Sequence, residues 1–194
     1  MNLSGIQKPF VVDKTSDVHF YAENKGVKSA IVKQTFYQVP SDRTITILSE
    51  VHPMYTAGGK DALIDGIVGT TNWKTGEWQS YFAKDFEAVI DLQKVRPINY
   101  VGVHVLQDVS PWIVYPKKVV FEISNDGKNY KPLTIVQNNI TMDEKGPVVQ
   151  ELGVKVKATA RYIRVKAKTG GNLPAWHEST GQPTHIFIDE VIVK

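Results

Sequence analysis

Short stretches in which apolar and polar residues alternate recur along most of the chain. Apolar side chains occupy every second position in 86–92, 101–105 and 161–167. Alternation of this kind buries one face of an extended strand and leaves the other in solvent. The stretch 186–193 is apolar on both faces, which predicts a central strand. Because no amphipathic helical run accompanies these stretches, the pattern predicts an all-β fold, a β-sandwich or jelly roll.

Turn residues separate the predicted strands and divide the chain. Asn125-Asp126-Gly127 lies between two apolar stretches and predicts a β-hairpin. Short strands are also predicted within residues 9–48, where too few strands follow one another to build a core. Pro53 and the pair Gly58-Gly59 then interrupt the pattern. We therefore predict a partial β segment over residues 1–57 and a jelly roll over residues 58–194.

Composition excludes several classes of function. The chain has 42% hydrophobic and 22% charged residues, which is typical of a globular protein. Its net charge of +3 is carried by scattered lysines, whereas nucleic-acid binding needs a clustered basic patch. The absence of cysteine excludes disulfides, thiolate metal sites and a cysteine nucleophile. No apolar run of about 18 residues predicts a membrane span, and no signal peptide is visible.

Three long irregular stretches interrupt the strands, at residues 66–84, 107–117 and 169–184. Loops longer than about 12 residues inside a domain are usually functional or disordered. These three contain all four tryptophans, which disordered segments seldom keep. We expect three ordered loops that converge at one end of the sandwich. The tryptophans are Trp73, Trp78, Trp112 and Trp176.

Six motifs in order make residues 58–194 resemble a known family. They are Ala62-x-x-Asp65-Gly66, the Thr/Trp loop after it, Val89-Ile90-Asp91-Leu92, Ile123-Ser124-Asn125-Asp126-Gly127 with Tyr130, Ala160-Arg161-Tyr162-Ile163-Arg164-Val165, and Ile188-Asp189-Glu190-Val191. Together they resemble the discoidin family, also called coagulation factor 5/8 type C domains, which includes the family 32 carbohydrate-binding modules.

The N-terminal stretch, through Phe20-Tyr21-Ala22 and Lys25–Ser29, is similar to a fibronectin-III-like domain. In tandem, the two parts resemble the C-terminal region of a Bacteroides-type family 20 β-N-acetylhexosaminidase (chitobiase). This resemblance implies a non-catalytic, monomeric fragment of an extracytoplasmic glycoside hydrolase. Its partners would be galactose- or N-acetylhexosamine-type glycans and the catalytic domain of the parent chain.

The resemblance also implies a structural calcium site at the Asp65-Gly66 turn. Calcium takes six to eight oxygen ligands from carboxylates, hydroxyls and carbonyls. The spacing after the turn leaves either Thr70 or Thr71 as the hydroxyl ligand. An interpretation without calcium is also open, in which Asp65 caps its own turn and Glu190 pairs with an Arg or Lys. The implied ligands are the carbonyls of Ala62 and Ile67 and the side chains of Asp65, Thr70 and Glu190.

Sugar binding needs a flat aromatic ring beside hydrogen-bonding side chains, because a pyranose has an apolar face and a rim of hydroxyls. Trp112 lies between two prolines that would preorganise it. The alternative is that these rings plug the sandwich, which the large buried fraction of most tryptophans favours for Trp73 and Trp78. The candidate sugar contacts are Trp112, Trp176, His177, Gln79 and Trp78.

Enzymatic chemistry has little support in the sequence. Asp189 and Glu190 are adjacent on a predicted strand, so they are expected on opposite faces rather than as a glycosidase pair. Arg161 is expected to form a structural ion pair with a carboxylate such as Asp91 or Glu122. The rival functions are a structural spacer that packs on the catalytic domain and a membrane-surface domain. An acidic Glu178 beside Trp176 argues against the latter.

Overall fold

The computed structural model describes residues 11–143 and 146–194, so the first part of the predicted strand region at residue 9 lies outside the described residues. The chain divides into two units, residues 1–39 and 40–194. The sequence placed this boundary near residue 57. The boundary lies earlier because β5 (Thr44–Ile47) pairs with β7 (Phe86–Gln107) and buries Ile45 in the core of the second unit.

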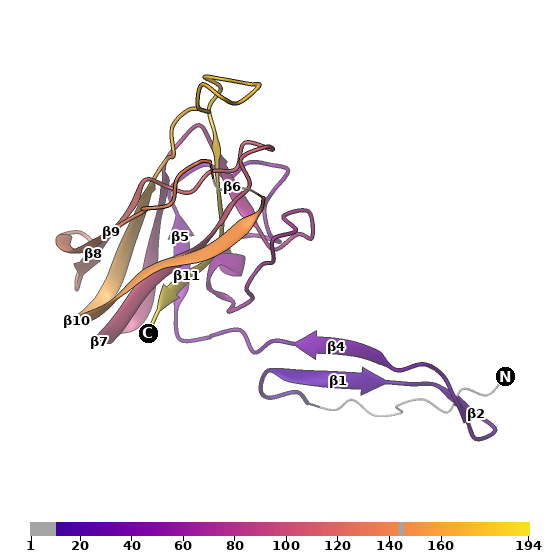
Figure 1. Cartoon of the computed structure of the whole chain (residues 1–194). Coiled ribbons are helices and arrows are strands. Elements are labelled where there is room, and N and C mark those ends of the chain that lie inside the picture. The colour runs from indigo at the N-terminus through magenta and orange to yellow at the C-terminus, as the bar shows by residue number, and fades with distance from the viewer. Residues whose placement is uncertain (1–10, 144–145) are drawn as a thin grey trace. The chain divides into compact units, whose positions relative to one another are not determined.

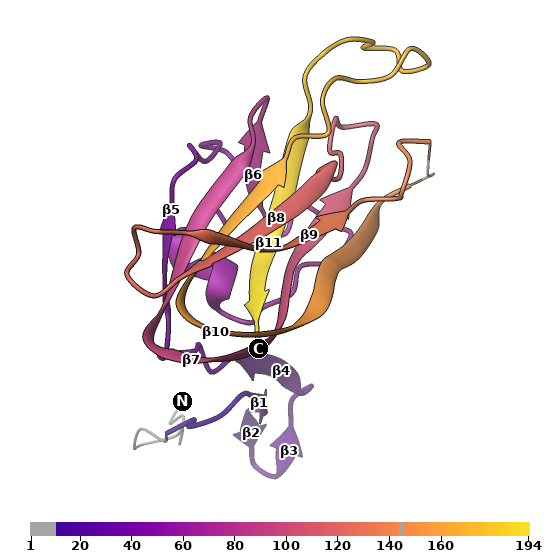
Figure 2. The ribbon, with the colours of Figure 1, turned by 90° about the vertical axis from the view of Figure 1, so that its left-hand side faces the viewer.

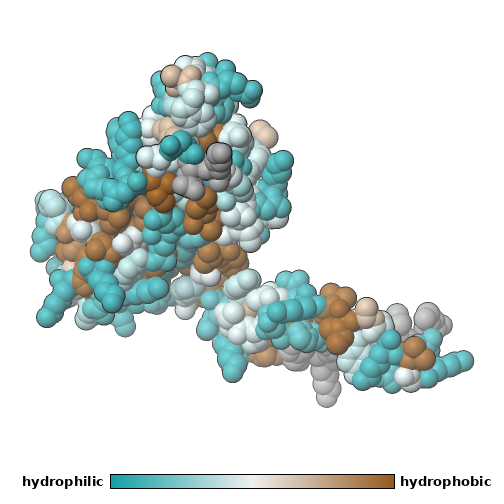
Figure 3. Space-filling model, in the orientation of Figure 1, coloured by the Kyte–Doolittle hydropathy of each residue, from teal (hydrophilic) through white to brown (hydrophobic). Residues whose placement is uncertain are grey.

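The N-terminal unit contains two small antiparallel sheets (Figure 1). One pairs β1 (Ser16–Phe20) with β4 (Val32–Phe36), and the other pairs β2 (Glu23–Asn24) with β3 (Val27–Lys28). None of the residues described in this unit is buried, and apolar side chains lie on its surface (Figure 3). Two-stranded sheets are marginal on their own, as the sequence pattern indicated.

The second unit is built on one antiparallel sheet of seven strands. Its strand order is β6-β11-β7-β10-β8-β9, and β5 pairs in addition with the first part of β7, whereas β11 pairs with the last part. A 3₁₀ helix, η1, precedes β6 and was not expected from the sequence. The remaining bounds are η1 Lys60–Ile64, β6 Gln79–Phe82, β8 Lys118–Ser124, β9 Lys131–Gln137, β10 Val148–Lys168 and β11 His185–Val193.

The sandwich forms because two strands are long enough to bend. β7 and β10 pair along almost their whole lengths, with register shifts between Lys155 and Ala158 and between Ala160 and Tyr162. Both strands curve at this point (Figure 2), so one sheet folds over onto itself. Phe86, Phe121 and Ile188, from three different strands, are fully buried between the two halves. This architecture confirms the predicted all-β sandwich.

Two further predictions about the strands are confirmed. β11 lies between β6 and β7 and is buried on both faces, as its continuous apolar pattern indicated. Arg161 donates to both oxygens of Asp91, at 2.8 and 2.9 Å, and so has the structural role expected of it. No helix in the described part of the chain is long and apolar enough to cross a membrane.

Candidate functional site

The turn that follows η1 has the conformation that its sequence predicts. Asp65 ends the helix, and Gly66 adopts φ 78°, a left-handed conformation that glycine reaches without strain. The Asp65 carboxylate accepts a hydrogen bond from the Ile67 N–H through Oδ1 at 2.7 Å. The side chain therefore closes the turn through one of its two oxygens.

A bulge in β11 brings two adjacent carboxylates to this loop. The pairing of β11 with β7 shifts register between Ile188 and Glu190. Glu190 accepts a hydrogen bond from the Gly66 N–H through Oε2 at 3.1 Å, and Asp189 accepts one from the Gly69 N–H through Oδ2. The expectation that Asp189 and Glu190 point to opposite faces was therefore wrong, because a bulge breaks the strict two-residue period of a strand.

Asp189 is the most enclosed of these carboxylates. Its side chain is fully buried, and both oxygens lie within hydrogen-bond distance of His104 Nδ1, at 2.7 and 2.9 Å. The His104 ring in turn stacks on Trp78, with ring centroids 5.6 Å apart and planes inclined by 21°. Asp189 thus ties β11, β7 and the loop after η1 together.

The carboxyl groups around the turn disfavour one another's charge. Burial raises the pKa of Glu190 to about 8, and the charges of Asp65 and Asp189 add to this effect. The Gly66 N–H and the Arg43 guanidinium act in the opposite direction. Burial, and then the charge of Asp189, also raise the pKa of the Asp65 carboxyl. The turn is therefore a site of unbalanced negative charge that either a proton or a cation relieves.

The structure brings some of the predicted calcium ligands together and not others. Ala62 in η1 and Ile67 after the turn flank Asp65, and Glu190 reaches the same turn. Thr70 is exposed, and its hydroxyl accepts a hydrogen bond from the Asn72 N–H at 3.2 Å. Within the described residues, no group of three or more His, Cys, Asp or Glu side chains is arranged to hold a metal ion. The expected set contains only two carboxylates, because its other ligands are carbonyls and a hydroxyl.

Two of the predicted sugar contacts are core residues. Trp78 is 1% exposed, and its indole N–H donates to the Thr70 carbonyl at 3.0 Å. Gln79 is equally buried, and its amide donates to the Gly59 carbonyl at 2.6 Å and accepts from the Tyr81 hydroxyl. Both side chains therefore pack within the domain, although Trp78 also forms part of the wall of the aromatic pocket described below. The packing alternative holds for Trp78.

The other three predicted contacts lie on two adjoining loops. Trp112 is half-buried against Leu173 and adopts φ 68°, a rare conformation for a bulky residue. Trp176 is 59% exposed in the long loop before β11, which is yellow at the top of Figure 1. His177 is buried, and its Nδ1 accepts a hydrogen bond from the Ser179 N–H, so it holds its own loop. Of these three residues, only Trp176 has an aromatic ring that is mostly exposed to solvent.

An aromatic pocket that the sequence did not identify lies beside the loop 66–78. It has a volume of about 540 Å³, and its walls include the rings of Tyr55 and Trp73, whose centroids are 5.8 Å apart in an edge-to-face arrangement. Both rings also pack near the ring of Phe187 in β11, with centroid distances of 5.0 Å from Tyr55 and 6.2 Å from Trp73. Trp73 was assigned to packing, and Tyr55 to a linker. The pairing of Thr56 with Gln79, which joins the two segments, has no local sequence signal.

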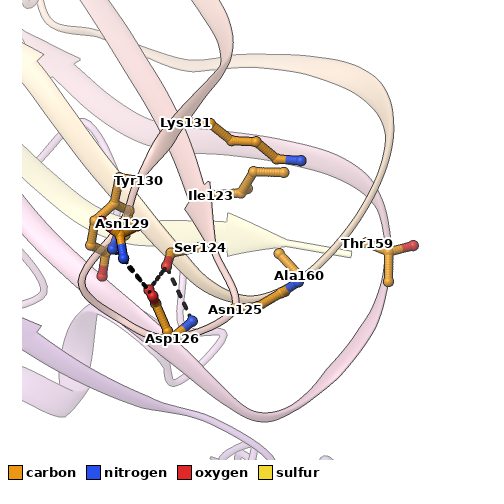
Figure 4. Close-up of a pocket in the computed structure, with 9 residues that line it drawn as sticks. All are labelled: Ile123, Ser124, Asn125, Asp126, Asn129, Tyr130, Lys131, Thr159 and Ala160. Atoms are coloured by element: carbon orange, nitrogen blue, oxygen red, sulfur yellow. Dashed lines mark hydrogen bonds between the residues drawn. The ribbon is translucent and has the colours of Figure 1, made fainter.

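A second hollow lies at the β8–β9 hairpin (Figure 4). Its one carboxylate, Asp126, accepts hydrogen bonds from the Lys128 and Asn129 N–H groups, from the Asn129 amide and from the Ser124 hydroxyl. These bonds hold its pKa well below the usual range for an aspartate. The carboxylate is therefore occupied by its own turn, and the hollow is weaker as a ligand site than the Tyr55–Trp73 pocket.

Comparison with known families now identifies the second unit. The model of the F5/8 type C domain matches residues 44–182, a range that begins at β5 and ends in the loop before β11. The chain belongs to the F5/8 type C family. The start of the match agrees with the early boundary, because it places β5 within the F5/8 type C domain.

Solved structures share the fold of this F5/8 type C domain. CBM32-3 from a family 31 glycoside hydrolase of Clostridium perfringens is 14% identical with a TM-score of 0.51, and the match covers 79% of this chain and 90% of that one. CpGH89 of the same organism, in complex with GlcNAc-α-1,4-galactose, is 15% identical with a TM-score of 0.50 over 79% of this chain and 14% of that one. The family 32 module of C. perfringens NanJ, in complex with galactose, is 16% identical with a TM-score of 0.48, and the match covers 79% of this chain and 93% of that one. No curated protein matches the chain.

Proposed function

We propose that the F5/8 type C domain is a non-catalytic carbohydrate-binding module of an extracytoplasmic glycoside hydrolase, with a family 20 β-N-acetylhexosaminidase as the parent. The observation that carries the proposal is the Tyr55–Trp73 pocket on a domain of this family. The module would bind galactose- or N-acetylhexosamine-type glycans weakly and hold the parent enzyme near its polymeric substrate, which raises the effective concentration. The neighbour CBM32-3 comes from a glycoside hydrolase, which supports this assignment.

The pocket has the two elements that sugar recognition needs. The Tyr55 and Trp73 rings supply apolar faces, and their contacts with Phe187 hold them in place before a ligand arrives. Polar groups at the same pocket come from Thr56 and from the backbone of Ala57 and Gly58. Ala57 is held at φ 48°, and strained backbone of this kind clusters at binding sites. Preorganised rings reduce the entropy cost of binding a flexible glycan.

The rival function is a spacer that binds no sugar. The half-buried Trp73 in the wall of a pocket favours a binding function, since a purely structural domain does not need a preformed aromatic pocket. The N-terminal unit is proposed to be part of a fibronectin-III-like domain that links the module to the catalytic domain of the parent. The chain is proposed to act as a monomer.

Replacing Trp73 with alanine is expected to weaken sugar binding by roughly tenfold or more, because buried aromatic anchors dominate binding free energies. The measurement is an NMR titration of the chain with galactose, N-acetylgalactosamine and N-acetylglucosamine at millimolar concentration. Shifts are expected at Tyr55, Thr56 and Trp73. The control is Trp176→Ala, which should bind as the unmodified chain does.

Two results would contradict this site. If the shifts gather at Trp112 and Trp176 and the Trp176→Ala variant loses affinity, the sugar binds to the loops before β8 and β11 instead. If no resonance moves with any of the three sugars, the spacer function is favoured.

We further propose that the turn binds a structural Ca²⁺ through the carbonyls of Ala62 and Ile67, the side chains of Asp65 and Glu190, and the hydroxyl of Thr70. The unbalanced charge at Asp65 and Glu190 supports this assignment, since a hard cation with oxygen ligands would relieve it. The Thr70 hydroxyl accepts one hydrogen bond, from the Asn72 N–H, and its oxygen has a second lone pair for the ion. The ion would brace the loop that carries Trp73.

Addition of 1 mM calcium, at about 100 times Kd, is expected to stabilise the chain by about 2.7 kcal/mol and to raise its melting temperature by a few degrees. Calorimetry with calcium and with a chelator measures the effect, and Glu190→Gln should remove it. The matched control is Asp61→Asn, because Asp61 is an exposed acid in the same 3₁₀ helix and pairs with Lys60. An unchanged melting temperature and no heat of binding in the unmodified chain would exclude the site.

A further inference from the structure

The charge of the Tyr55–Trp73 pocket is entirely positive. Of its nine lining residues, Lys74 is the one with a charged side chain, and no acidic residue lines the pocket. No carboxylate of the described residues lies within 4 Å of the Lys74 ammonium. The lysine therefore brings an uncompensated positive charge to a wall that is otherwise aromatic and neutral.

The position of this ammonium is defined by its neighbours. Nζ lies 4.9 Å from the centroid of the Trp73 ring, which is within the range of a cation–π interaction. Asn72 fixes the backbone of the loop, because its side chain accepts from the Lys74 N–H at 3.3 Å and its carbonyl accepts from the Thr75 N–H at 3.2 Å. The Lys74 charge is thus held beside the same ring on which a sugar would pack.

The nearest acid along the chain does not neutralise this charge. Glu77 is three residues after Lys74, and its carboxylate accepts a hydrogen bond from the Thr75 hydroxyl. Gly76, which lies between them, has φ 101°, a conformation that side chains rarely adopt. Of these two charged residues, only the lysine lines the pocket.

Neutral sugars are usually held by acceptors as well as donors, and the carboxylates of Asp and Glu are strong acceptors for sugar hydroxyls. The pocket lacks any carboxylate and offers an ammonium, which has three donors and no acceptor. A ligand with its own negative group satisfies Lys74 better than a sugar hydroxyl does, because the attraction between opposite charges adds to the hydrogen bond.

We infer that this pocket selects acidic glycans, in which a carboxylate or sulfate on the sugar pairs with Lys74 while the sugar ring packs on Tyr55 and Trp73. The inference rests on the proposed sugar-binding function and adds the charge class of the ligand to it. Carboxylate and sulfate share the required chemistry, so uronic acids and sulfated hexosamines are the two sources to distinguish.

The test compares matched neutral and acidic sugars by NMR titration at low and at physiological salt. Galactose is paired with galacturonic acid, and N-acetylgalactosamine with its 6-sulfate. The acidic member of at least one pair is expected to bind about three- to fivefold more tightly, as an exposed ion pair of up to about 1 kcal/mol implies, and the difference should shrink at higher salt. The pair that shows the difference identifies uronate or sulfate as the preferred group.

Lys74→Gln keeps most of the side-chain length and removes the charge. In this variant the acidic and neutral members of each pair should bind equally, because the charge that distinguishes them has been removed. Lys60→Gln is the control, because Lys60 is an exposed lysine of the neighbouring helix and already pairs with Asp61; it should leave the preference intact.

Three outcomes overturn the inference, and they differ in what they leave standing. If neutral and acidic sugars bind the unmodified chain equally, the charge preference is wrong but the sugar-binding function holds. If the preference for acidic sugars persists in Lys74→Gln, a group other than Lys74 binds the acidic group of the ligand. If neither class of sugar shifts any resonance, both the inference and the proposed function fail.

Discussion

Replacing Trp78 with alanine is expected to lower the free energy of unfolding by roughly 3–5 kcal/mol. The indole is 1% exposed and stacks on His104, and its N–H donates to the Thr70 carbonyl. A Cβ placed on Gly69 would lie 2.7 Å from two atoms of the same indole, so the backbone already approaches the ring as closely as a glycine allows. The neighbours cannot collapse into the cavity that alanine would leave, because the strands beneath them are tied by backbone pairing.

Denaturant unfolding followed by far-UV circular dichroism measures this loss. The matched control is Trp176→Ala, which removes the same side chain from an exposed loop and should change stability by at most about 0.5 kcal/mol. If Trp78→Ala retained full stability but lost sugar binding, the indole would be a ligand contact and its place in the core would be refuted.

Asp189→Ala is expected to cost roughly 3–5 kcal/mol, because removal of one partner from a buried, hydrogen-bonded pair leaves the other partners unsatisfied. The Asp189 carboxylate is fully buried and accepts from the Gly69 N–H, and His104 Nδ1 lies 2.7 Å from it. The loss should appear as a lower denaturation midpoint with an unchanged denaturant slope.

Asp189→Asn serves as the control for shape, since an amide oxygen can still accept from one of these donors. Its cost should be clearly smaller than that of the alanine variant. Equal costs for both variants would show that the charge, and not the filled volume and hydrogen bonds, stabilises this part of the fold. If Asp189→Ala left the free energy of unfolding unchanged, Asp189 would not be needed to hold the loop.

The strands were predictable because their cause is local. Alternation over 86–92 and 161–167 predicted the half-buried strands β7 and β10, and the two apolar faces of 186–193 predicted the interior position of β11. The turn at Asp126-Gly127 was equally local, because the aspartate bonds to backbone groups two and three residues ahead. The Asp65-Gly66 turn follows the same logic.

The domain boundary and half of the site were not predictable in this way. Pro53 and Gly58-Gly59 have the composition of a linker, but they lie in a loop of the F5/8 type C domain, because β5 before them pairs with β7. The same misassignment hid Tyr55, whose partner Trp73 lies in a different loop. The sequence showed that the loops contain four tryptophans, but it did not show which of them would be buried.

The sequence by itself determined which segments become strands, where the tight turns occur and to which family the chain is similar, because side-chain alternation and turn chemistry act over a few residues. Only the tertiary structure decided that Trp78 is buried while Trp73 is half-buried at the pocket that both rings line, and that a bulge turns both Asp189 and Glu190 toward one loop. These outcomes depend on strand register and on contacts between residues far apart in the chain, and neither leaves a local pattern in the sequence.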